Sequence, residues 1–380
     1  MKKLLIDVNP VVPYYVTGRT NGIGRTTLNL IEALGKVRDI PFEISLYSQN
    51  MKGIGYEGPM SRFPRHHLYM PHRERWNRVL ARFPVREWLT GYDVMHIPNN
   101  FEFVRHPERC VVTLHDAFFM RIHDSRFDYD KMRRLTPPFI RRCRHILTCS
   151  EYSKRDIVDT IGVSPEKITV IPWGIDPKTF HPSADPAATR AAVEKHFGIP
   201  RPYFLSVSCH GQRKRADVLT RAYLNLLQER KLTHDLVLVW GDPPAELVRE
   251  AAAAAPSSRV HFLSGLSDAD LLQVYQAAAA LIFPSAYEGF GLPVLEAMAC
   301  GVPVVTCSNS SLPEAGGDAA IYIEEPIERS LGEAMLRLER GDFALAALAE
   351  RGLERASRFT WDRVASETLK VYAAALEQKT

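Results

Sequence analysis

Short runs of β-branched and other apolar residues recur along the chain, and segments with helical patterns separate them. Nearly every position of a run is apolar, rather than alternate ones, which is typical of strands buried on both faces of a parallel sheet. Six runs fall in the first half (KLLIDV, FEISLYS, DVMHIP, CVVTLHD, HILTCS and KITVIP) and six in the second (YFLSVS, DLVLVWGD, RVHFLSG, AALIFPS, VPVVTC and AAIYIE). So many strands exceed one sheet at a length of 380 residues, and two sets predict two doubly wound, Rossmann-like α/β domains.

A proline-rich segment divides the two sets of strands. PWGIDPKTFHPSADP, residues 172–186, holds four prolines and shows no helical or strand periodicity. Such a composition is typical of a connection between domains. We therefore expect an N-terminal domain over residues 1–178, a second domain over 179–360 and a C-terminal helix over 361–380.

Composition limits the class of protein. Hydrophobic residues make up 46% of the chain and charged residues 24%, as in globular proteins. No apolar run approaches the roughly 18 residues that a membrane-spanning helix needs. Near the N-terminus, Asp7 and Asn9 interrupt MKKLLIDV, which indicates a first strand rather than a signal peptide. The six cysteines lack C-x-x-C and zinc-ligand spacing, so we expect reduced core thiols and a cytoplasmic protein.

Positive charge is concentrated in the first half of the chain. Residues 1–180 hold 28 Lys and Arg against 19 Asp and Glu, whereas the remainder holds 20 against 25. Segment 61–89 alone has seven arginines and two glutamates, with Trp76, Leu80 and Phe83 at helical spacing. Two interpretations stay open: a surface helix whose apolar side packs on its own domain, or a peripheral contact with an anionic membrane at its inner face. No nucleic-acid partner is predicted.

The stretch YEGFGLPVLEAMACGVPVV, residues 287–305, places two glutamates in an apolar, glycine-rich run. It begins in the predicted loop SAYEGFG that follows the strand AALIFPS, and Pro293 and Gly301 mark the start and end of a helix. Glu288 is thus predicted in the loop and Glu296 one turn into the helix. Buried carboxylates need polar partners, and a helix N-terminus favours phosphate. We therefore predict a ligand with hydroxyls on both sides of an anion, as in a nucleotide sugar.

The same stretch resembles the signature of retaining glycosyltransferases of the GT-B fold, in particular glycosyltransferase family 4. The family's E-x7-E pair corresponds to Glu288 and Glu296. The resemblance implies that Glu288 holds hydroxyls of the donor sugar and that Glu296 holds the ribose. Further donor contacts are expected between the two glutamates, at Gly289, Phe290, Gly291 and Leu292. The resemblance also implies two domains facing a cleft, and a C-terminal helix near Trp361 that crosses back to the N-terminal domain.

A basic pair follows the first strand of the second half. YFLSVSCHGQRKRADVL, residues 203–219, reads as a strand ending near Ser208, with Arg213 and Lys214 entering the next helix. An arginine fork and a lysine point charge can neutralise a departing diphosphate. The resemblance implies this catalytic and donor-binding role for both residues, although Ser208 and Cys209 stand where the family usually has glycine.

A weaker motif follows the first strand of the chain. TNGIGRTTLNLIEAL, residues 20–34, opens an amphipathic helix and resembles the family's glycine-rich loop, which faces the donor phosphate and the acceptor. Gly22 and Gly24 then correspond to donor-binding positions and Arg25 to an acceptor-side position. G-x-G-R alone is weak evidence, and a plain turn is the alternative.

CVVTLHDAFF places His115 and Asp116 directly after a strand. The resemblance implies a catalytic position for His115 close to the sugar and an acceptor-side position for Asp116. A structural role is the alternative for a single histidine after a strand. TCSEYSKRDI also resembles the family, but Ser150 and Ser153 fit a helix cap equally well.

Two D-x-D strings raise the question of a metal ion. Asp268 and Asp270 lie in GLSDADLL, which predicts a helix cap and first turn. Asp128 and Asp130 lie in a charged loop with no apolar strand before it. We predict no metal site and no cofactor, and we find no motif typical of an enzymatic nucleophile.

Together these observations predict a retaining glycosyltransferase that moves a hexose from a nucleotide-diphosphate sugar to a glycan or lipid-linked acceptor and makes an α-glycosidic bond. The resemblance extends to bacterial mannosyltransferases of surface-polysaccharide synthesis, so GDP-mannose is the first candidate donor, with UDP- and dTDP-sugars open. Two other functions also stay open, because a fold alone does not decide function. They are a sugar-nucleotide epimerase and a non-catalytic subunit that binds nucleotide sugars for a polysaccharide assembly complex.

Overall fold

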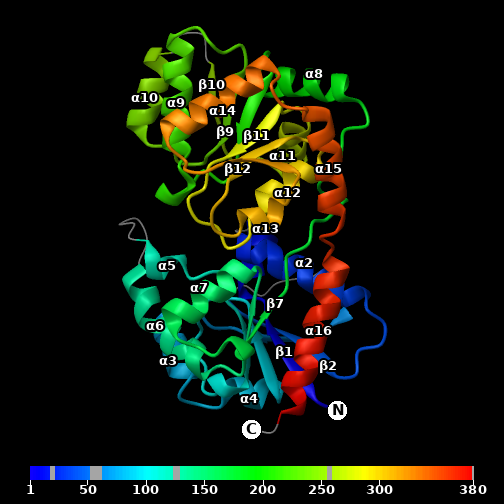
Figure 1. The fold of residues 1–380 in the computed structure, drawn as a ribbon. Helices are drawn as coiled ribbons and strands as arrows, with labels where there is room; N and C mark the ends of the chain where they lie inside the picture. The colour runs from blue at the N-terminus through cyan, green and yellow to red at the C-terminus, as the bar shows by residue number, and fades with distance from the viewer. Residues whose placement is uncertain (18–21, 52–61, 123–128, 255–258, 379–380) are drawn as a thin grey trace. The chain divides into compact units, whose positions relative to one another are not determined.

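The computed structural model describes residues 1–17, 22–51, 62–122, 129–254 and 259–378, which form two compact α/β units (Figure 1). Unit 1 contains Met1–Gly174 and Thr360–Thr380, and unit 2 contains Ile175–Phe359. The chain leaves unit 1 within the proline-rich segment 172–186. In this fully described segment no helix or strand comes before Pro186, where the first helix of unit 2 begins.

A parallel seven-stranded sheet forms the centre of unit 1. Its order is β3-β2-β1-β4-β5-β6-β7. The strands are β1 (Lys3–Asp7), β2 (Glu43–Gln49), β3 (Arg65–Leu68), β4 (Val94–Ile97), β5 (Cys110–Thr113), β6 (His145–Thr148) and β7 (Ile168–Val170). Six of these coincide with the predicted apolar runs. The sequence did not predict β3, because this edge strand reads RHHL and none of its residues is buried.

The described helices of unit 1 flank this sheet. They are α1 (Val12–Thr17), α2 (Gly22–Lys36), α3 (Glu74–Leu80), α4 (Val85–Thr90), α5 (Phe118–Arg121), α6 (Tyr129–Arg142), α7 (Glu151–Ile161) and α16 (Trp361–Glu377). The C-terminal helix α16, red in Figure 1, packs against α2 and against β1 and β4. Its Tyr372 hydroxyl lies 2.6 Å from Nδ1 of the buried His96 on β4. The end of the chain is thereby part of the first unit.

A parallel six-stranded sheet forms the centre of unit 2. Its order is β10-β9-β8-β11-β12-β13. The strands are β8 (Tyr203–Ser206), β9 (Asp235–Val239), β10 (Val260–Leu263), β11 (Ala280–Phe283), β12 (Val304–Cys307) and β13 (Ala320–Ile323). All six coincide with predicted runs. The prediction of two parallel α/β domains is confirmed.

Two groups of helices flank the sheet of unit 2. One group holds α9 (Ala216–Gln228), α10 (Ala245–Ala254) and α14 (Glu328–Arg340), and the other holds α8 (Pro186–Phe197), α11 (Asp268–Gln276), α12 (Leu292–Ala299), α13 (Leu312–Gly316) and α15 (Leu345–Ser357). Local sequence explains several helix ends: Asp185 caps α8 and is followed by proline, and Gly198 ends it in the left-handed conformation. Ser150 likewise caps α7 through the Ser153 N–H, as predicted.

In both sheets, the side on which successive strands are added changes next to the first strand of the unit. In unit 2, the chain adds β9 and β10 on one side of β8 and then β11, β12 and β13 on the other. Two neighbouring strands, β8 and β11, therefore send their following loops to opposite faces. A crevice at this switch point is where open parallel sheets bind ligands. In unit 1 the corresponding pair is β1 and β4.

All six cysteines are buried free thiols, in agreement with the predicted core positions. None of the described helices has both the length and the apolar character required to cross a membrane.

Candidate functional site

The predicted basic pair lies in the loop that follows β8. Arg213 and Lys214 belong to a single 3₁₀ turn over Gln212–Lys214, and α9 begins only at Ala216. The prediction that the pair enters the helix is therefore corrected. Arg215, in the left-handed conformation at φ 52°, separates the turn from the helix. This break aims the basic pair at the neighbouring loop, which follows β11.

Three hydrogen bonds tie the β8 and β11 loops together. The Ala286 N–H donates to the Arg213 carbonyl at 2.7 Å, and the Ser285 hydroxyl donates to the same carbonyl at 3.3 Å. The Arg213 guanidinium in turn donates to the Tyr287 carbonyl at 2.8 Å. The loops after two neighbouring strands thus form one structural block at the switch point of the sheet.

Glu288 forms ion pairs with both basic residues. Its Oε1 lies 2.5 Å from Lys214 Nζ and 3.0 Å from Arg213 Nη1. Lys214 and Glu288 are buried, at 8% and 7% exposed, whereas Arg213 is half-buried. Lys214 Nζ also lies 4.8 Å from the centroid of the Phe283 ring at the end of β11. The structure therefore brings together three of the residues that the sequence predicted for the donor site.

Burial and charge act in opposite directions on Glu288 and Lys214. Burial raises the pKa of Glu288, but Lys214, Arg213 and hydrogen bonds lower it more, and the pKa falls to about 2. Burial lowers the pKa of Lys214, and Glu288 offsets part of that effect. Because an isolated buried charge is very costly, each group keeps the other ionised. The cluster carries two positive charges and one negative charge.

The N-terminus of α12 lies directly after this cluster in the chain. Gly291 precedes the helix at φ 102°, a left-handed conformation that favours glycine, and Pro293 is within the first turn, as predicted. Gly289 and Phe290 are buried in the connecting loop. At the start of α12 the Leu292 N–H can donate to an anion, whereas Pro293 has no N–H and the Val294 N–H donates to the Gly291 carbonyl at 3.0 Å.

Glu296 lies one turn into α12, as predicted, and its surroundings differ from those of Glu288. It is half-buried, and its Oε2 accepts a hydrogen bond of 2.7 Å from the hydroxyl of Tyr275 at the end of α11. Tyr275 itself is fully buried. The phenol fixes one carboxylate oxygen of Glu296, so this glutamate is positioned by a neutral donor.

Three serines that the sequence analysis did not single out support the Glu288 loop. The Ser310 hydroxyl accepts from the Glu288 N–H at 3.1 Å, and the Ser311 hydroxyl donates to the Glu288 carbonyl at 2.9 Å. Ser285 donates to the Tyr287 carbonyl at 3.1 Å. Ser310 and Ser311 follow β12, the next strand in the sheet. Their position after a parallel strand places them at this edge of the sheet, but hydroxyls after strands are too common to single them out from the sequence.

In unit 1, the predicted glycine motif forms the start of α2. Gly22 is exposed at the first position of the helix, and Gly24 is buried in its first turn. Arg25 is half-buried. The prediction of a loop is corrected for these three residues, since they already belong to the helix; Thr20 and Asn21 lie outside the described residues. A Cβ added to Gly22 would meet no atom within 4 Å, so its surroundings are open.

His115 and Asp116 follow β5, as predicted, and both are half-buried. His115 Nε2 lies 3.4 Å from the Pro98 carbonyl, and the imidazole ring lies 5.5 Å from the Trp173 ring. Burial lowers the pKa of His115 to about 4. Asp116 Oδ1 accepts from the Phe118 N–H at 3.3 Å. His115 is therefore a neutral side chain at ordinary pH.

Two models of known protein families match this sequence. The family model "Glycosyltransferase Family 4" matches residues 20–179, and "Glycosyl transferases group 1" matches residues 192–355. Between them the two models span most of both units. The chain belongs to the family 4, group 1 glycosyltransferases.

A relative and two solved structures match this glycosyltransferase over almost its whole length. O-antigen chain mannosyltransferase B of Escherichia coli is 26% identical, over 97% of this chain and 99% of its own. Sucrose-phosphate synthase from Thermosynechococcus elongatus superposes with a TM-score of 0.76 at 18% identity, over 98% of this chain and 99% of its own. Anabaena HepE, solved with UDP-glucose, has a TM-score of 0.71 at 18% identity, over 98% and 100%. The two solved structures show the shared GT-B fold.

The D-x-D strings of the glycosyltransferase have structural partners. Asp270 forms a capping box with Ser267 at the start of α11, as the sequence predicted. Asp130 pairs with Arg133 at 2.9 Å in α6, and Asp128 lies outside the described residues. Within the described part of the chain, no group of three or more His, Cys, Asp or Glu side chains is arranged to hold a metal ion.

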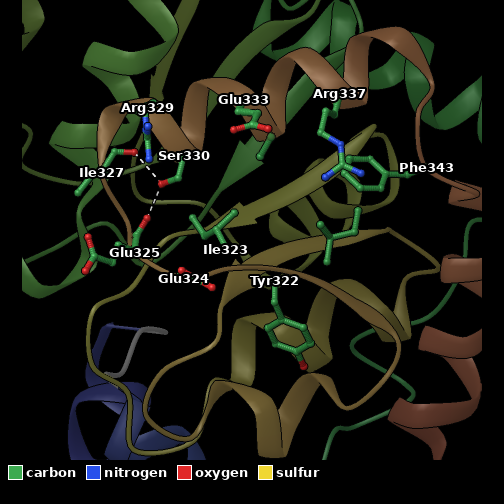
Figure 2. Close-up of a pocket in the computed structure, with 12 residues that line it drawn as sticks. Tyr322, Ile323, Glu324, Glu325, Ile327, Arg329, Ser330, Glu333, Arg337 and Phe343 are labelled. Carbon is green, nitrogen blue, oxygen red and sulfur yellow. Dashed lines mark hydrogen bonds between the residues drawn. The ribbon is translucent and has the colours of Figure 1, made fainter.

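A surface pocket of about 260 Å³ lies between β13 and α14 of the glycosyltransferase (Figure 2). Its lining mixes three glutamates with Arg329 and Arg337, and Figure 2 shows the Arg337 guanidinium against the Phe343 ring. The Ser330 hydroxyl donates to the carbonyls of Glu325 and Ile327. None of the predicted site residues lines this pocket. The three glutamates outnumber the two arginines, so the charge of this pocket does not suit a diphosphate as the Glu288 cluster does.

Proposed function

We propose that this glycosyltransferase transfers a hexose from a nucleotide-diphosphate sugar to a hydroxyl of a glycan or lipid-linked acceptor, with retention at the anomeric carbon and without a metal ion. The observation that carries the proposal is the cluster of Arg213, Lys214 and Glu288 directly before the N-terminus of α12. It combines net positive charge with the positive end of a helix dipole at the switch point of the sheet. A diphosphate requires both features.

Catalysis would come mainly from electrostatic stabilisation. As the bond between the anomeric carbon and the diphosphate oxygen breaks, its electron pair moves to the phosphate and the sugar becomes oxocarbenium-like. Lys214 and Arg213 are already held in place by Glu288 and Tyr287, so little reorganisation is needed when this negative charge develops. The two cations supply the electrostatic function that a divalent metal provides in other transferases.

Retention would follow from attack on the same face that the diphosphate leaves. The acceptor oxygen forms the new bond to the anomeric carbon, and its proton passes to the departing phosphate oxygen. Glu288 is a poor candidate for a nucleophile or base, because its two cationic partners keep its pKa at about 2. The proposed step therefore needs no protein carboxylate as a nucleophile.

We assign Glu288 two functions within the proposal. It would accept hydrogen bonds from hydroxyls of the donor sugar, as the resemblance implies, and it would also keep Lys214 protonated in its buried position. The second function follows from the 2.5 Å ion pair and from the burial that lowers the pKa of Lys214. Glu296, which Tyr275 orients, would hold the ribose hydroxyls of the nucleotide.

The candidate residues of unit 1 would contribute weaker contacts. The N-terminal turn of α2 at Gly22 and Gly24 is suited to a donor phosphate, and neutral His115 is suited to a sugar hydroxyl. Arg25 and Asp116 are assigned to the acceptor side. Several of these groups are neutral or backbone donors, which suits recognition of uncharged sugar hydroxyls.

For the donor, we propose GDP-mannose first. The full-length relative from Escherichia coli is named as a mannosyltransferase, whereas the HepE structure contains UDP-glucose. UDP- and dTDP-sugars therefore belong in the same experiment.

The six buried thiols also support placing the protein in the reducing cytoplasm.

A panel of nucleotide sugars tests the proposed reaction. We expect nucleotide diphosphate release that increases when a glycan or lipid-linked acceptor is added, and an α-linked product by NMR from an α-linked donor. Conversion of the sugar without acceptor would instead identify an epimerase. Binding of the donor with no release in any combination would identify a non-catalytic subunit.

The same assay tests metal independence. We expect the rate to be unchanged after EDTA treatment, because Lys214 and Arg213 neutralise the diphosphate. Loss of activity with EDTA that Mn²⁺ or Mg²⁺ restores would contradict this part of the proposal.

A further inference from the structure

Exposed hydrophobic side chains of the described residues are concentrated in one segment of unit 1. Ten large hydrophobic residues are exposed, and five of them lie between residues 69 and 89: Tyr69 (70%), Val79 (46%), Phe83 (56%), Trp88 (78%) and Leu89 (41%). Scattered single exposed residues are normal, but such a concentration indicates an interaction surface.

Arginines surround the same apolar residues. Positions 75, 78 and 79 follow the i, i+3, i+4 spacing that places residues on one face of α3, and they carry Arg75, Arg78 and Val79. All three are exposed, whereas Asn77 on the other side of α3 is buried. Arg82 and Phe83, also exposed, lie in the turn between α3 and α4. We call Arg75, Arg78, Val79, Arg82, Phe83 and Trp88 the α3–α4 surface.

The structure changes which residues of segment 61–89 form this surface. Leu80, predicted on the same apolar side as Phe83, packs inside the unit at 5% exposed, and Trp76 is half-buried. Arg86 is also buried, at 4% exposed, and donates to the Phe103 carbonyl. Arg62 donates to three carbonyls at the end of α2, including that of Gly35. The apolar part is therefore Val79, Phe83 and Trp88 rather than the predicted set.

Buried polar contacts hold α3 and α4 in place. Asn77 donates to Glu102 at 3.1 Å and accepts from Gln49 at 2.9 Å. Arg86 reaches the same Glu102 at 3.9 Å and lies 5.3 Å from the Tyr47 ring. These contacts join both helices to β2 and to the loop after β4. The exposed aromatic residues are thus presented by a supported scaffold rather than by a free loop.

We infer that the α3–α4 surface binds an anionic lipid bilayer at the headgroup level. Arginine heads can pair with lipid phosphates, while Phe83 and Trp88 insert at the boundary of the acyl chains. Glu74, the acidic residue within α3, is already paired with Arg78 at 2.7 Å and with Lys131 at 2.5 Å, so it does not cancel the positive charge of Arg75 and Arg82. Charge complementarity therefore favours an anionic membrane over a neutral one.

This inference goes beyond the proposed function, because vesicle binding can be measured without donor or acceptor. The test is flotation of the full chain with vesicles of phosphatidylcholine alone and of phosphatidylcholine mixed with phosphatidylglycerol. We expect the protein to float with the mixed vesicles at low salt, to remain unbound with the neutral ones, and to dissociate as salt is raised.

Two pairs of variants separate the charged and apolar contributions. Arg75→Gln with Arg82→Gln should weaken binding by about fivefold for each arginine removed. Phe83→Ser with Trp88→Ser should weaken binding while leaving its salt dependence unchanged. All four side chains are exposed, so the variants should fold. Matched controls on unit 2 are Arg249→Gln with Arg340→Gln, and Val248→Ser with Ile327→Ser, which should bind like the parent.

Three outcomes would overturn the inference. They are equal binding to neutral and anionic vesicles, equal loss in the unit 2 controls, and binding that survives both α3–α4 pairs. Light scattering without lipid tests whether a second copy of the chain covers this surface instead. A dimer in the parent protein that is lost in the variant with Phe83→Ser and Trp88→Ser would show that it does. Donor turnover with a water-soluble acceptor should be unchanged in every variant, so a failed membrane test leaves the proposed reaction intact.

Discussion

The two units share one sheet order around their first strand but carry different chemistry at the strand ends. In unit 2, the loops after β8 and β11 present Lys214 and Glu288 as a buried ion pair with Arg213 beside it. In unit 1 the corresponding strands are β1 and β4, and the candidate residue His115 follows β5, the next strand in the sheet; burial keeps it neutral by lowering its pKa to about 4. The candidate residues after the strands therefore include a charged cluster in unit 2 and a neutral imidazole in unit 1.

Backbone strain at residues other than glycine also differs between the two units. Among the described residues, four that are not glycine have a positive φ, namely Ser208, Arg215, Arg230 and Ser310, and all four belong to unit 2. Ser208 and Arg215 flank the basic pair, and Ser310 supports Glu288. Strained conformations persist where the surrounding structure holds them, and they are often found at functional sites. The strained backbone positions and the charged cluster of Arg213, Lys214 and Glu288 therefore lie in the same unit.

The strongest test of this comparison breaks the ion pair. We expect Lys214→Ala and Glu288→Ala each to lower kcat by about 10²-fold or more, because the first removes a cation beside the departing diphosphate and the second removes the carboxylate that positions this cation and contacts the donor sugar. The double variant should lose little more than either single one, since both act through the same pair. Steady-state kinetics on all three proteins measures this, with exposed Glu333→Ala on α14 as the control. Independent, multiplicative losses would show that the pair does not act as a unit.

The pH dependence of kcat/KM tests the protonation states of Lys214 and Glu288. Burial lowers the pKa of Lys214, so its positive charge is present at low pH and is lost as pH rises through that lowered value. We expect kcat/KM to fall by about tenfold per pH unit beyond that point, which lies below the usual range for lysine. Glu288 should add no acidic limb above about pH 3, because its pKa is about 2. Lys214→Arg, which stays charged, should remove the alkaline limb; a limb that remains would belong to another group.

Substitutions of the two glutamates of the motif should change different kinetic constants. Glu296→Ala removes contacts made equally in the ground and transition states, so the donor KM should rise by about tenfold while kcat changes less. Calorimetry with free nucleotide diphosphate gives a second readout. Affinity should drop for Glu296→Ala and stay nearly normal for Glu288→Ala, because the diphosphate replaces Glu288 as the counter-ion of Lys214. The reverse pattern would mean that the sugar and ribose roles are exchanged.

The neutral site of unit 1 should have a smaller effect. His115→Gln removes a hydrogen bond between neutral groups, so we expect kcat to fall by about tenfold or less. Since the pKa of His115 is about 4, the imidazole is already neutral between pH 6 and 7, and its titration should not appear there. An inflection of kcat/KM in that range that the variant abolishes would show that His115 works as a charged acid.

The smallest expected effect concerns backbone strain. Ser208 has a φ of 55° at an exposed position, so Ser208→Gly should stabilise the protein by about 0.5–1 kcal/mol. Ser164 in unit 1 is the matched control: it is exposed at φ −64°, and Ser164→Gly should destabilise slightly. Denaturant unfolding of both variants measures the difference. A gain in both proteins would indicate that strain at Ser208 is not the cause.

Sequence patterns predicted the fold class well, because strands buried on both faces must be apolar throughout. Leu4, Leu5 and Ile6 of β1, for example, are fully buried, and the run KLLIDV shows this directly. The edge strand β3 escaped detection because RHHL has no such constraint. The burial of Arg86 could not be read from its residue type either, because arginine is usually exposed.

The residues of the candidate site were also predicted, but their pairing was not. The sequence identified Arg213, Lys214 and Glu288 as separate groups, with the cations assigned to the diphosphate and the glutamate to the sugar. Their ion pairs join residues that are 74 and 75 positions apart. The supporting serines Ser310 and Ser311 were missed, because a hydroxyl after a strand is common and carries no pattern of its own.

The sequence by itself therefore determined the two parallel sheets, the positions of the strand-end loops and the types of charged residue in them. Burial acts on each strand locally, and so it leaves a local pattern of apolar residues. Contacts between distant segments place β8 beside β11. This pairing brings Lys214 to Glu288 and shifts the pKa of both side chains. Strand order depends on contacts between distant segments, and a pKa depends on the burial and charges that those contacts create.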